Sequence, residues 1–283
     1  MGAKARGSKS PLTGWMESKK TPTRLIGPIE RHILLRPLDT SRRQDVLHPS
    51  ELVKDDFCVR AAYFRLIGKV APQERPNLRL QSIFDEGHAV HAKWQGYLAE
   101  MGVLYGVWDT LEGRTWGLSG DLYGDAKYRE VPLTDDALRI AGHSDGWVKG
   151  LGDDFLIEIK SIGPGTIRVE NPSLFRNGDL FAAWREVRRP FPTHVRQGQL
   201  YLALANRMKD RGELESAPQE IVFIYELKAD QSAKEFVVAY DPALSKDALD
   251  DAYDIVKAVE SGVAPDCRFE GCKNCTAYEE EVA

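Results

Sequence analysis

One segment of the chain constrains its fold more than any other, because it combines a nearly continuous apolar run with two charged side chains. The apolar residues of the run are Phe155, Leu156, Ile157 and Ile159. A strand that is buried on both faces of a sheet has this pattern. Glu158 and Lys160 lie in the same run, where charged groups are costly unless they are paired or bound to a metal ion. The segment therefore predicts a buried central strand that carries a polar site.

A tight turn before this strand determines how it pairs. Residues 150–153 read Gly-Leu-Gly-Asp, and a hairpin built on the two middle residues places Asp145 directly opposite Glu158. Directly opposed side chains have Cβ atoms about 4.5–5.5 Å apart, and like charges at that distance repel. A divalent cation between the two carboxylates removes the repulsion. The alternative is a solvated hairpin whose acidic side chains simply face water.

Strand alternation completes the predicted site. Glu158 and Lys160 are two residues apart, so they lie on one face of the strand. The side chain of Ile159 points into the core, while its carbonyl can still reach the edge of a metal site. Hard oxygen ligands of this kind suit Mg²⁺ or Mn²⁺.

These residues also form a known pattern. Asp145, a turn, and then Glu158-Ile159-Lys160 resemble the signature of the PD-(D/E)xK nucleases, with Ser144 in place of the proline. Two further elements resemble motifs of RecB-type exonucleases. Gly87 and His91 match G-x-x-x-H, in which the histidine is a metal ligand, and the spacing puts the glycine one helical turn away, where it clears space beside the imidazole. Gln197 and Tyr201 match Q-x-x-x-Y and fall on one helical face, where they can reach a phosphate or support the metal site.

The cysteines suggest a second metal centre. Cys58 stands alone, whereas Cys267, Cys272 and Cys275 form C-x₄-C-x₂-C. Four thiolates can close one 4Fe–4S cluster or one tetrahedral zinc site. One distant cysteine plus a C-terminal trio resembles the iron–sulfur members of the RecB-type nucleases, which include the AddB nuclease domain and the CRISPR-associated iron–sulfur exonuclease family. The long gap comes first in this trio, whereas those families mostly place the short gap first. This resemblance implies a 4Fe–4S cluster, with zinc as the alternative.

A cationic segment precedes the Q-x-x-x-Y element. Its arginines include Arg188, Arg189 and Arg196, and Trp184 and Phe191 lie among them. Such a segment can contact phosphates and stack on bases. The alternative is a solvated loop whose arginine side chains cover apolar surface.

The order of elements predicts an α/β fold. Helices are expected from Pro49 to Ile67 (with a break near Asp55), over Leu80–Met101, Thr193–Asn206 and Ser245–Glu260. Strands are expected over Val103–Trp108, Thr115–Ala126, Leu138–Lys149, Asp154–Ser161, Glu220–Leu227 and Glu235–Tyr240. We expect a mixed central sheet flanked by helices, with the N- and C-terminal segments joined by the four cysteines. Residues 1–25 are expected to be a disordered basic tail, and residues 26–283 a single domain.

Composition excludes some classes of protein. The net charge is −5, so any affinity for nucleic acid depends on local patches. The longest apolar runs are far shorter than a membrane span, which argues against a membrane partner. The basic N-terminal segment has no apolar core of a secretory signal, so we expect a reducing, cytoplasmic compartment.

The resemblance to RecB-type nucleases implies a restriction-endonuclease-like core and a DNA exonuclease. His91, Asp145, Glu158 and the Ile159 carbonyl would hold Mg²⁺ or Mn²⁺, and Lys160 would orient or deprotonate the attacking water. The substrate would be single-stranded DNA or DNA ends in recombination, repair or phage replication, alongside a recombinase. Two alternatives remain: a CRISPR spacer-acquisition subunit that works with an integrase, and an inactive iron–sulfur module that only binds DNA.

Overall fold

The computed structural model describes residues 24–37, 42–71, 75–122, 125–176 and 178–279. The chain divides into two compact units, formed by residues 1–39 with 74–83 and by residues 40–73 with 84–283. The first unit contains α2 (Ile26–Leu35), which the sequence pattern did not predict. Arg75 holds the end of α2 by donating to the carbonyls of Leu34 (3.0 Å) and Arg36 (2.6 Å). Nearly all of the expected tail, residues 1–25, lies outside the described residues.

The second unit is built on a mixed sheet, as expected. Its described strands are β1 (Leu104–Thr110), β2 (Gly113–Leu118), β3 (Lys127–Arg129), β6 (Gly146–Val148), β7 (Phe155–Ile162), β8 (Glu220–Leu227) and β9 (Ala233–Ala239). The strand order is β2-β1-β6-β7-β8-β9, and β3 pairs with β1. β7 and β8 are parallel, whereas the other pairs are antiparallel. The apolar run singled out above is therefore a central strand.

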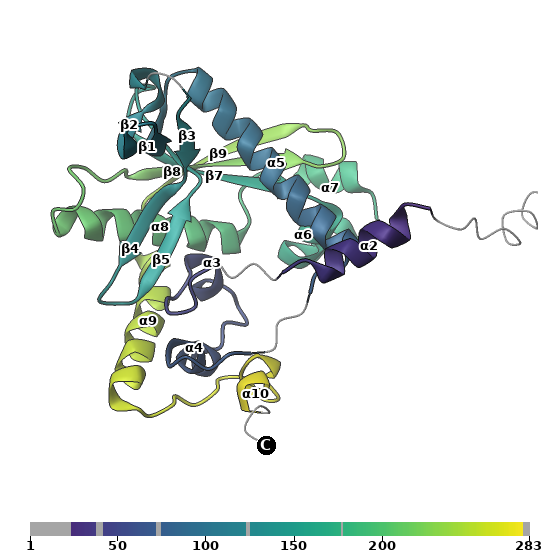
Figure 1. The fold of residues 1–283 in the computed structure, drawn as a ribbon, viewed down its shortest axis with the longest axis vertical. Helices are drawn as coiled ribbons and strands as arrows, with labels where there is room; N and C mark the ends of the chain where they lie inside the picture. The colour runs from purple at the N-terminus through teal and green to yellow at the C-terminus, as the bar shows by residue number, and fades with distance from the viewer. Residues whose placement is uncertain (1–23, 38–41, 72–74, 123–124, 177, 280–283) are drawn as a thin grey trace, which may run out of the picture. The chain divides into compact units, whose positions relative to one another are not determined.

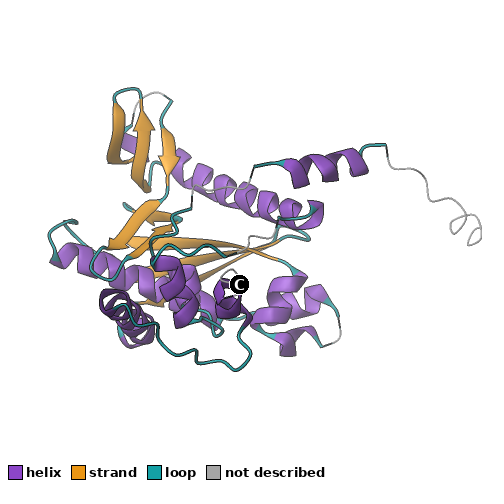
Figure 2. Cartoon of the chain, turned by 60° about the horizontal axis from the view of Figure 1, so that its bottom comes forward, coloured by secondary structure: helices purple, strands orange, loops and turns teal. Residues whose placement is uncertain are grey.

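Helices cover both faces of this sheet. On one face, Val90 of α5 (Leu78–Glu100) packs with Ile157, Ile159 and Val222. On the other face, α8 (Pro192–Asp210) packs against β8, and α9 (Ala243–Ser261) packs against α8. Figure 1 shows α5 and α8 on opposite sides of the strands, and Figure 2 shows the same layers from another direction. Because side chains alternate along β7, Glu158 and Lys160 lie on the face that α8 covers.

The remaining elements of the second unit are short. The helices are α3 (Pro49–Leu52), α4 (Val59–Leu66), α6 (Pro164–Glu170), α7 (Leu180–Glu186) and α10 (Lys273–Glu279), and the 3₁₀ turns are η1 (Ser119–Asp121) and η2 (Pro172–Phe175). The break between α3 and α4 confirms the interruption expected near Asp55. Every helix in the described part of the chain is too short or too polar to span a bilayer.

The predicted bounds of two strands were wrong. The strand expected over Thr115–Ala126 ends at Leu118, where η1 turns the chain toward β3. The strand expected over Leu138–Lys149 is divided at Asp145 into β5 (Ile140–Ser144) and β6. β5 leaves the central sheet and pairs with β4 (Val131–Asp135) in a separate two-stranded sheet.

Local contacts explain the division at Asp145. The Ser144 hydroxyl donates to the Ile157 carbonyl at 2.9 Å, which anchors the bend to β7. Gly146 follows at a place without room for a side chain. A Cβ there would lie 2.7 Å from Leu104 Cδ1 and 2.9 Å from Ile157 Cδ1. The pairing of β6 with β7 ends at Gly146 and Ile157, so the edge of β7 beyond Ile157 is open to the side chain of Asp145.

Candidate active site and cysteine cluster

Asp145 lies at the end of the hairpin and is fixed from several sides. The last pair of the β6–β7 ladder is Gly146↔Ile157, so Asp145 and Glu158 occupy the next opposed positions, as the sequence predicted. Asp145 Oδ2 accepts a hydrogen bond from the Ile159 amide at 2.5 Å. The carbonyl of Asp145 accepts from Gln95 Nε2 at 2.9 Å and from the Tyr128 hydroxyl at 3.2 Å. The carboxylate thus occupies the place that the next strand residue would take.

His91 on α5 also reaches this carboxylate. Its Nδ1 lies 3.2 Å from Asp145 Oδ1. Burial alone would lower the pKa of His91, but the hydrogen bond and charge of Asp145 outweigh burial and raise it. Gly87 does not make room for the imidazole as the sequence suggested. A Cβ at Gly87 would have Ser161 Oγ of β7 as its neighbour, at an ordinary contact distance of 3.7 Å.

Glu158 is a buried carboxylate with one unpaired oxygen. Its Oε1 accepts from Lys160 Nζ at 2.6 Å, whereas its buried Oε2 has no hydrogen-bond partner within the described structure. Burial raises the pKa of Glu158 to about 7, and the positive charge of Lys160 opposes this only in part. A buried acceptor without a partner is destabilising, so this oxygen is suited to a ligand that the protein itself does not supply.

Lys160 is held between the β7 strand and α8. Besides Glu158, its ammonium donates to Gln197 Oε1 at 3.3 Å. Gln197 Nε2 in turn donates to the Tyr201 hydroxyl at 3.0 Å, so the Q-x-x-x-Y pair supports the lysine. Burial alone would lower the pKa of Lys160, but the charges of Glu158 and Asp145 raise it. The lysine therefore carries a proton and balances the acidic groups.

The structure adds Glu130, which the sequence did not identify. Ligand atoms of His91, Glu130 and Asp145 all lie within 4.8 Å of one another, a spacing that can hold a metal ion. Burial, together with the negative charge of Asp145, raises the pKa of Glu130 to about 7. Glu130 follows the three-residue strand β3 and belongs to no recognisable motif, so no sequence signal marked it.

Together these residues have the chemistry of a divalent-cation site. Glu130 and Asp145 supply carboxylate oxygens and His91 supplies a ring nitrogen, and the carboxylate of Glu158 interacts electrostatically with Asp145 and His91. The raised pKa values of Glu130 and Glu158 show that burying several carboxylates together is unfavourable without a counter-charge. The buried Oε2 of Glu158, which has no hydrogen-bond partner in the described structure, also indicates a site for a positively charged ligand. These residues fit Mg²⁺ or Mn²⁺, both of which prefer oxygen ligands.

The predicted arginine segment is only partly available to a ligand. Arg188 and Arg189 line a 510 Å³ cavity. Arg196 donates to the Val53 carbonyl at 3.0 Å and pairs with Asp55 at 2.6 Å, so it joins α8 to the loop after α3. Trp184 and Phe191 are buried, and neither ring is exposed for stacking on a base. The expectation of base stacking at these two residues was wrong, because both rings are used in the core.

The four cysteines converge although they lie far apart in the sequence. Their sulfur atoms lie within 4.8 Å of one another, and Cys58 Sγ is 3.7 Å from Cys267 Sγ. Cys58 also caps α4 by accepting from the Ala61 amide at 3.4 Å. Cys272 directly precedes α10, and Cys275 lies within it. The cysteines thereby link the N-terminal and C-terminal regions of the chain, and α10 lies beside α4 (Figure 1).

Other contacts reinforce this link. Arg60 donates to the Pro265 carbonyl at 3.1 Å, and Asn274 donates to the Asp56 carbonyl at 3.4 Å. None of the four cysteines forms a disulfide, and burial raises the pKa of Cys58 to about 11. Burial would also raise the pKa of Cys272, but hydrogen bonds from Cys275 and Asn274 amides and from neighbouring thiols lower it to about 7. Four unbridged, converging sulfur atoms fit a bound metal or cluster, because their thiolates are the ligands that such centres use.

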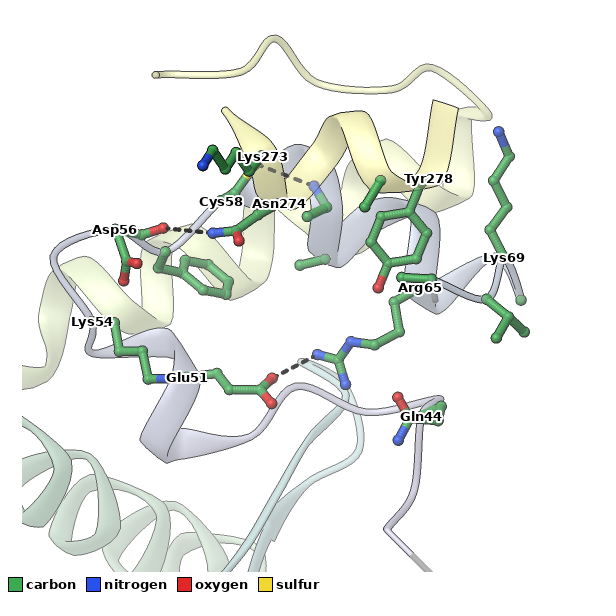
Figure 3. Close-up of a pocket in the computed structure, with 17 residues that line it drawn as sticks. Gln44, Glu51, Lys54, Asp56, Cys58, Arg65, Lys69, Lys273, Asn274 and Tyr278 are labelled. Atoms are coloured by element: carbon green, nitrogen blue, oxygen red, sulfur yellow. Dashed lines mark hydrogen bonds and ion pairs between the residues drawn. The ribbon is translucent and has the colours of Figure 1, made fainter. Parts of the chain in front are cut away.

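A cavity of 560 Å³ adjoins the cysteine cluster. Cys58, Arg65 and Tyr278 are among its lining residues, which come from α3, α4, α10 and the segments beside them. Figure 3 shows Arg65 reaching across this cavity to Glu51, and their ion pair has an N–O distance of 3.0 Å. Arg65 and Glu51 therefore neutralise each other in the lining of this cavity.

Comparisons with known proteins give weak similarities. No family model and no curated protein matches the chain. Among solved structures, LHK-Exo in complex with dAMP is 18% identical, with 77% of this chain and 90% of that chain covered and a TM-score of 0.41. An alkaline exonuclease (LHK-Exo) from Laribacter hongkongensis is 14% identical, with coverages of 85% and 96% and a TM-score of 0.42. The protein SSO0001 is 14% identical, with coverages of 91% and 93% and a TM-score of 0.36. At these identities and TM-scores, the similarities assign neither family nor activity to this chain.

Proposed function

We propose that this protein is a metal-dependent nuclease that hydrolyses phosphodiester bonds of DNA. The observation that carries the proposal is the buried, unpaired Oε2 of Glu158, which lies in one site with Asp145, His91 and the ammonium of Lys160. The oxygens of a carboxylate buried only for a structural ion pair usually all have hydrogen-bond partners. An open oxygen beside other acidic groups and a fixed lysine is the arrangement that a hydrolytic metal site needs.

The residues have separate roles in this proposal. Glu130, Asp145, Glu158 and His91 would hold Mg²⁺ or Mn²⁺, together with the Ile159 carbonyl. Bound there, the ion would lower the pKa of a water molecule and stabilise negative charge on the scissile phosphate. Lys160 would orient that water and balance the charge that develops on the phosphate oxygens. Gln197 and Tyr201 keep the lysine in position through the hydrogen bonds described above.

We further propose exonuclease action on single-stranded DNA or DNA ends, with residues 26–283 acting as one nuclease domain of the RecB type. Arg188 and Arg189 would contact the DNA backbone at the cavity that they line, and Arg196 would position α8 for this purpose. Cys58, Cys267, Cys272 and Cys275 would hold a 4Fe–4S cluster with a structural role, with zinc as the alternative. Support for a centre of this kind comes from the convergence of four sulfur atoms.

Activity can be tested with two site variants and a matched surface control. We expect Glu158→Gln and Lys160→Ala to abolish Mn²⁺-dependent degradation of DNA strands labelled at the 5′ or the 3′ end. Lys246→Ala removes an exposed lysine that pairs with Asp250 on α9, and it should leave the rate unchanged. Stepwise loss of the label from one end would identify an exonuclease and its polarity. If folded Lys160→Ala degraded DNA as fast as the wild type, the assignment of this site would be wrong.

The cysteine centre needs a separate test. Iron, sulfide and zinc analysis of the purified protein, with a visible absorption spectrum, distinguishes a 4Fe–4S cluster from zinc. We expect about four iron and four sulfide per chain for the cluster. Protein purified without oxygen that contained neither iron nor zinc would contradict a metal centre at these residues.

A further inference from the structure

A cavity of 700 Å³ lies directly beside the candidate metal site and has no role in the mechanism above. Glu130 belongs to both, since it lines the cavity and is one of the grouped metal-ligand candidates. Gln95 and Tyr128 also line the cavity, and both donate to the carbonyl of Asp145. A molecule in this cavity would therefore extend from the place where we propose that the bond is cut.

The register of three strands determines which side chains face this cavity. Val107 of β1 is opposite Trp116 of β2 and Arg129 of β3. Asp109, two residues further along β1, is opposite Arg114 and Lys127. Opposed residues share a face, and residues two apart on a strand share it as well. One face of β2-β1-β3 therefore carries a tryptophan, two arginines and a lysine, and all four line the cavity.

The charges on this face favour an anionic ligand. Asp109 is the acidic residue between the cations, and it contacts Arg114 Nε at 3.2 Å and Arg129 Nε at 2.5 Å. These ion pairs fix both guanidinium groups, and each guanidinium has further N–H donors for another partner. Glu130 also lines the cavity, so three cations against two carboxylates leave a surplus of one positive charge, although the whole chain carries −5.

Trp116 gives the same face an aromatic surface. The residue is 40% exposed, and its ring is held by Tyr105, whose ring centroid is 5.7 Å away. An exposed indole next to several cations is suited to stacking on a nucleobase while the cations contact the phosphates. Bases in a duplex are already stacked on their neighbours, so the surface selects a single strand.

We propose that this face is the binding site for the nucleotides of single-stranded DNA that flank the scissile phosphate. One base stacks on Trp116, and the backbone phosphates contact Arg114, Lys127 and Arg129. The position of the flanking nucleotides rests on the proposed nuclease function, but the binding itself does not. Trp116 is then a positioning residue, because it acts on the substrate away from the reacting atoms.

Binding can be measured without cleavage. Fluorescence anisotropy of a labelled dT₁₀ strand in EDTA gives the affinity of the metal-free protein, and a labelled ten-base-pair duplex is the comparison. We expect Trp116→Ala to weaken binding of dT₁₀ about tenfold or more, and Trp116→Phe to retain most of the affinity. Lys127→Ala should reduce the dependence of log Kd on log salt by about one phosphate contact. Tyr253→Ala, which removes a 53% exposed aromatic side chain from α9, is the control and should bind as the wild type does.

The outcomes separate this inference from the nuclease proposal. Unchanged dT₁₀ binding by folded Trp116→Ala, or equal affinity for dT₁₀ and the duplex, overturns the binding face even if the wild type cleaves DNA. A wild type that never cleaves DNA, but whose dT₁₀ binding depends on Trp116, overturns the nuclease proposal and leaves the binding face intact. Far-ultraviolet circular dichroism of each variant identifies loss of fold, and the salt dependence measured with Lys127→Ala supplies the result if Trp116→Ala does not fold.

Discussion

The prediction that tests the geometry most directly is Gly146→Ala, which adds one methyl group beside Asp145. The new Cβ would lie 2.7 Å from Leu104 Cδ1 and 2.9 Å from both Cδ1 and Cγ1 of Ile157. Carbon atoms in contact are normally about 3.5–4.0 Å apart, so the neighbours must move by roughly 1 Å. Leu104 is 0% and Ile157 is 1% exposed, so neither side chain can escape into solvent. The strain must instead displace β6 relative to β1 or β7.

Two measurable effects follow from this displacement. Adding a methylene-sized group to a packed core typically costs about 1–3 kcal/mol, which we expect as a lower free energy of unfolding in urea. Because Asp145 precedes the displaced residue, its bond to the Ile159 amide should lengthen as well. A shift of about 1 Å at a catalytic group can lower a rate about a hundredfold. We therefore expect weaker Mn²⁺ binding and at least a tenfold loss of nuclease activity.

The control for this substitution is Gly96→Ala, at a helical glycine on α5. A Cβ there meets no atom within 4 Å, and Ala in a helix interior is favoured over Gly by about 0.5–1 kcal/mol. The control should be slightly more stable than the wild type and equally active. If Gly146→Ala matched the wild type in urea midpoint and in cleavage rate, the packing described around the bend would be refuted.

Three further predictions concern other parts of the second unit. Burial, with the nearby charge of Lys160, lowers the pKa of His194 to about 3, so the ring is uncharged in the folded protein. An unfolded histidine takes up a proton below about pH 6.5, so the free energy of unfolding is highest above that pH. We expect it to fall by about 2 kcal/mol between pH 7 and pH 5. His194→Gln should lose correspondingly less over this range in urea unfolding, and an identical pH dependence would contradict the buried neutral ring. Gly87→Ala should keep near-normal activity, because its Cβ would meet Ser161 Oγ at 3.7 Å; a large loss of cleavage rate would show that the glycine itself is needed. If the four cysteines hold the proposed metal centre, Cys275→Ser should lose that metal and expose α10 to limited proteolysis while the sheet keeps its circular dichroism signal, and a variant with full metal content would rule out Cys275 as a ligand.

Local patterns in the sequence were sufficient for much of the central sheet and of the site. The apolar run that contains Glu158 predicted a buried strand, and the assumed hairpin gave the observed register that places Asp145 opposite Glu158. The two-residue turn was wrong, because the ladder ends at Val148↔Phe155 and a longer loop joins the strands. The strand Glu220–Leu227 was predicted with its observed bounds, because its middle residues, 221–225, form an unbroken apolar run. Convergence of the four cysteines was also predictable, since a lone cysteine and a distant trio together supply the four thiolates of one metal centre.

Other parts were decided by contacts between residues that are distant along the chain. The bend at Asp145 depends on Leu104 and Ile157, which leave no room for a side chain at Gly146, and no periodicity of residues 138–149 records that contact. Glu130 reaches the site only because β3 pairs with β1 and brings it beside His91 and Asp145. The sequence by itself determined which strand carries the charged groups, since burial of an apolar run is a local property. Only the tertiary structure decided which further groups meet there, because packing and strand pairing bring together segments that are distant in the sequence. The pattern of one such segment does not identify its partner.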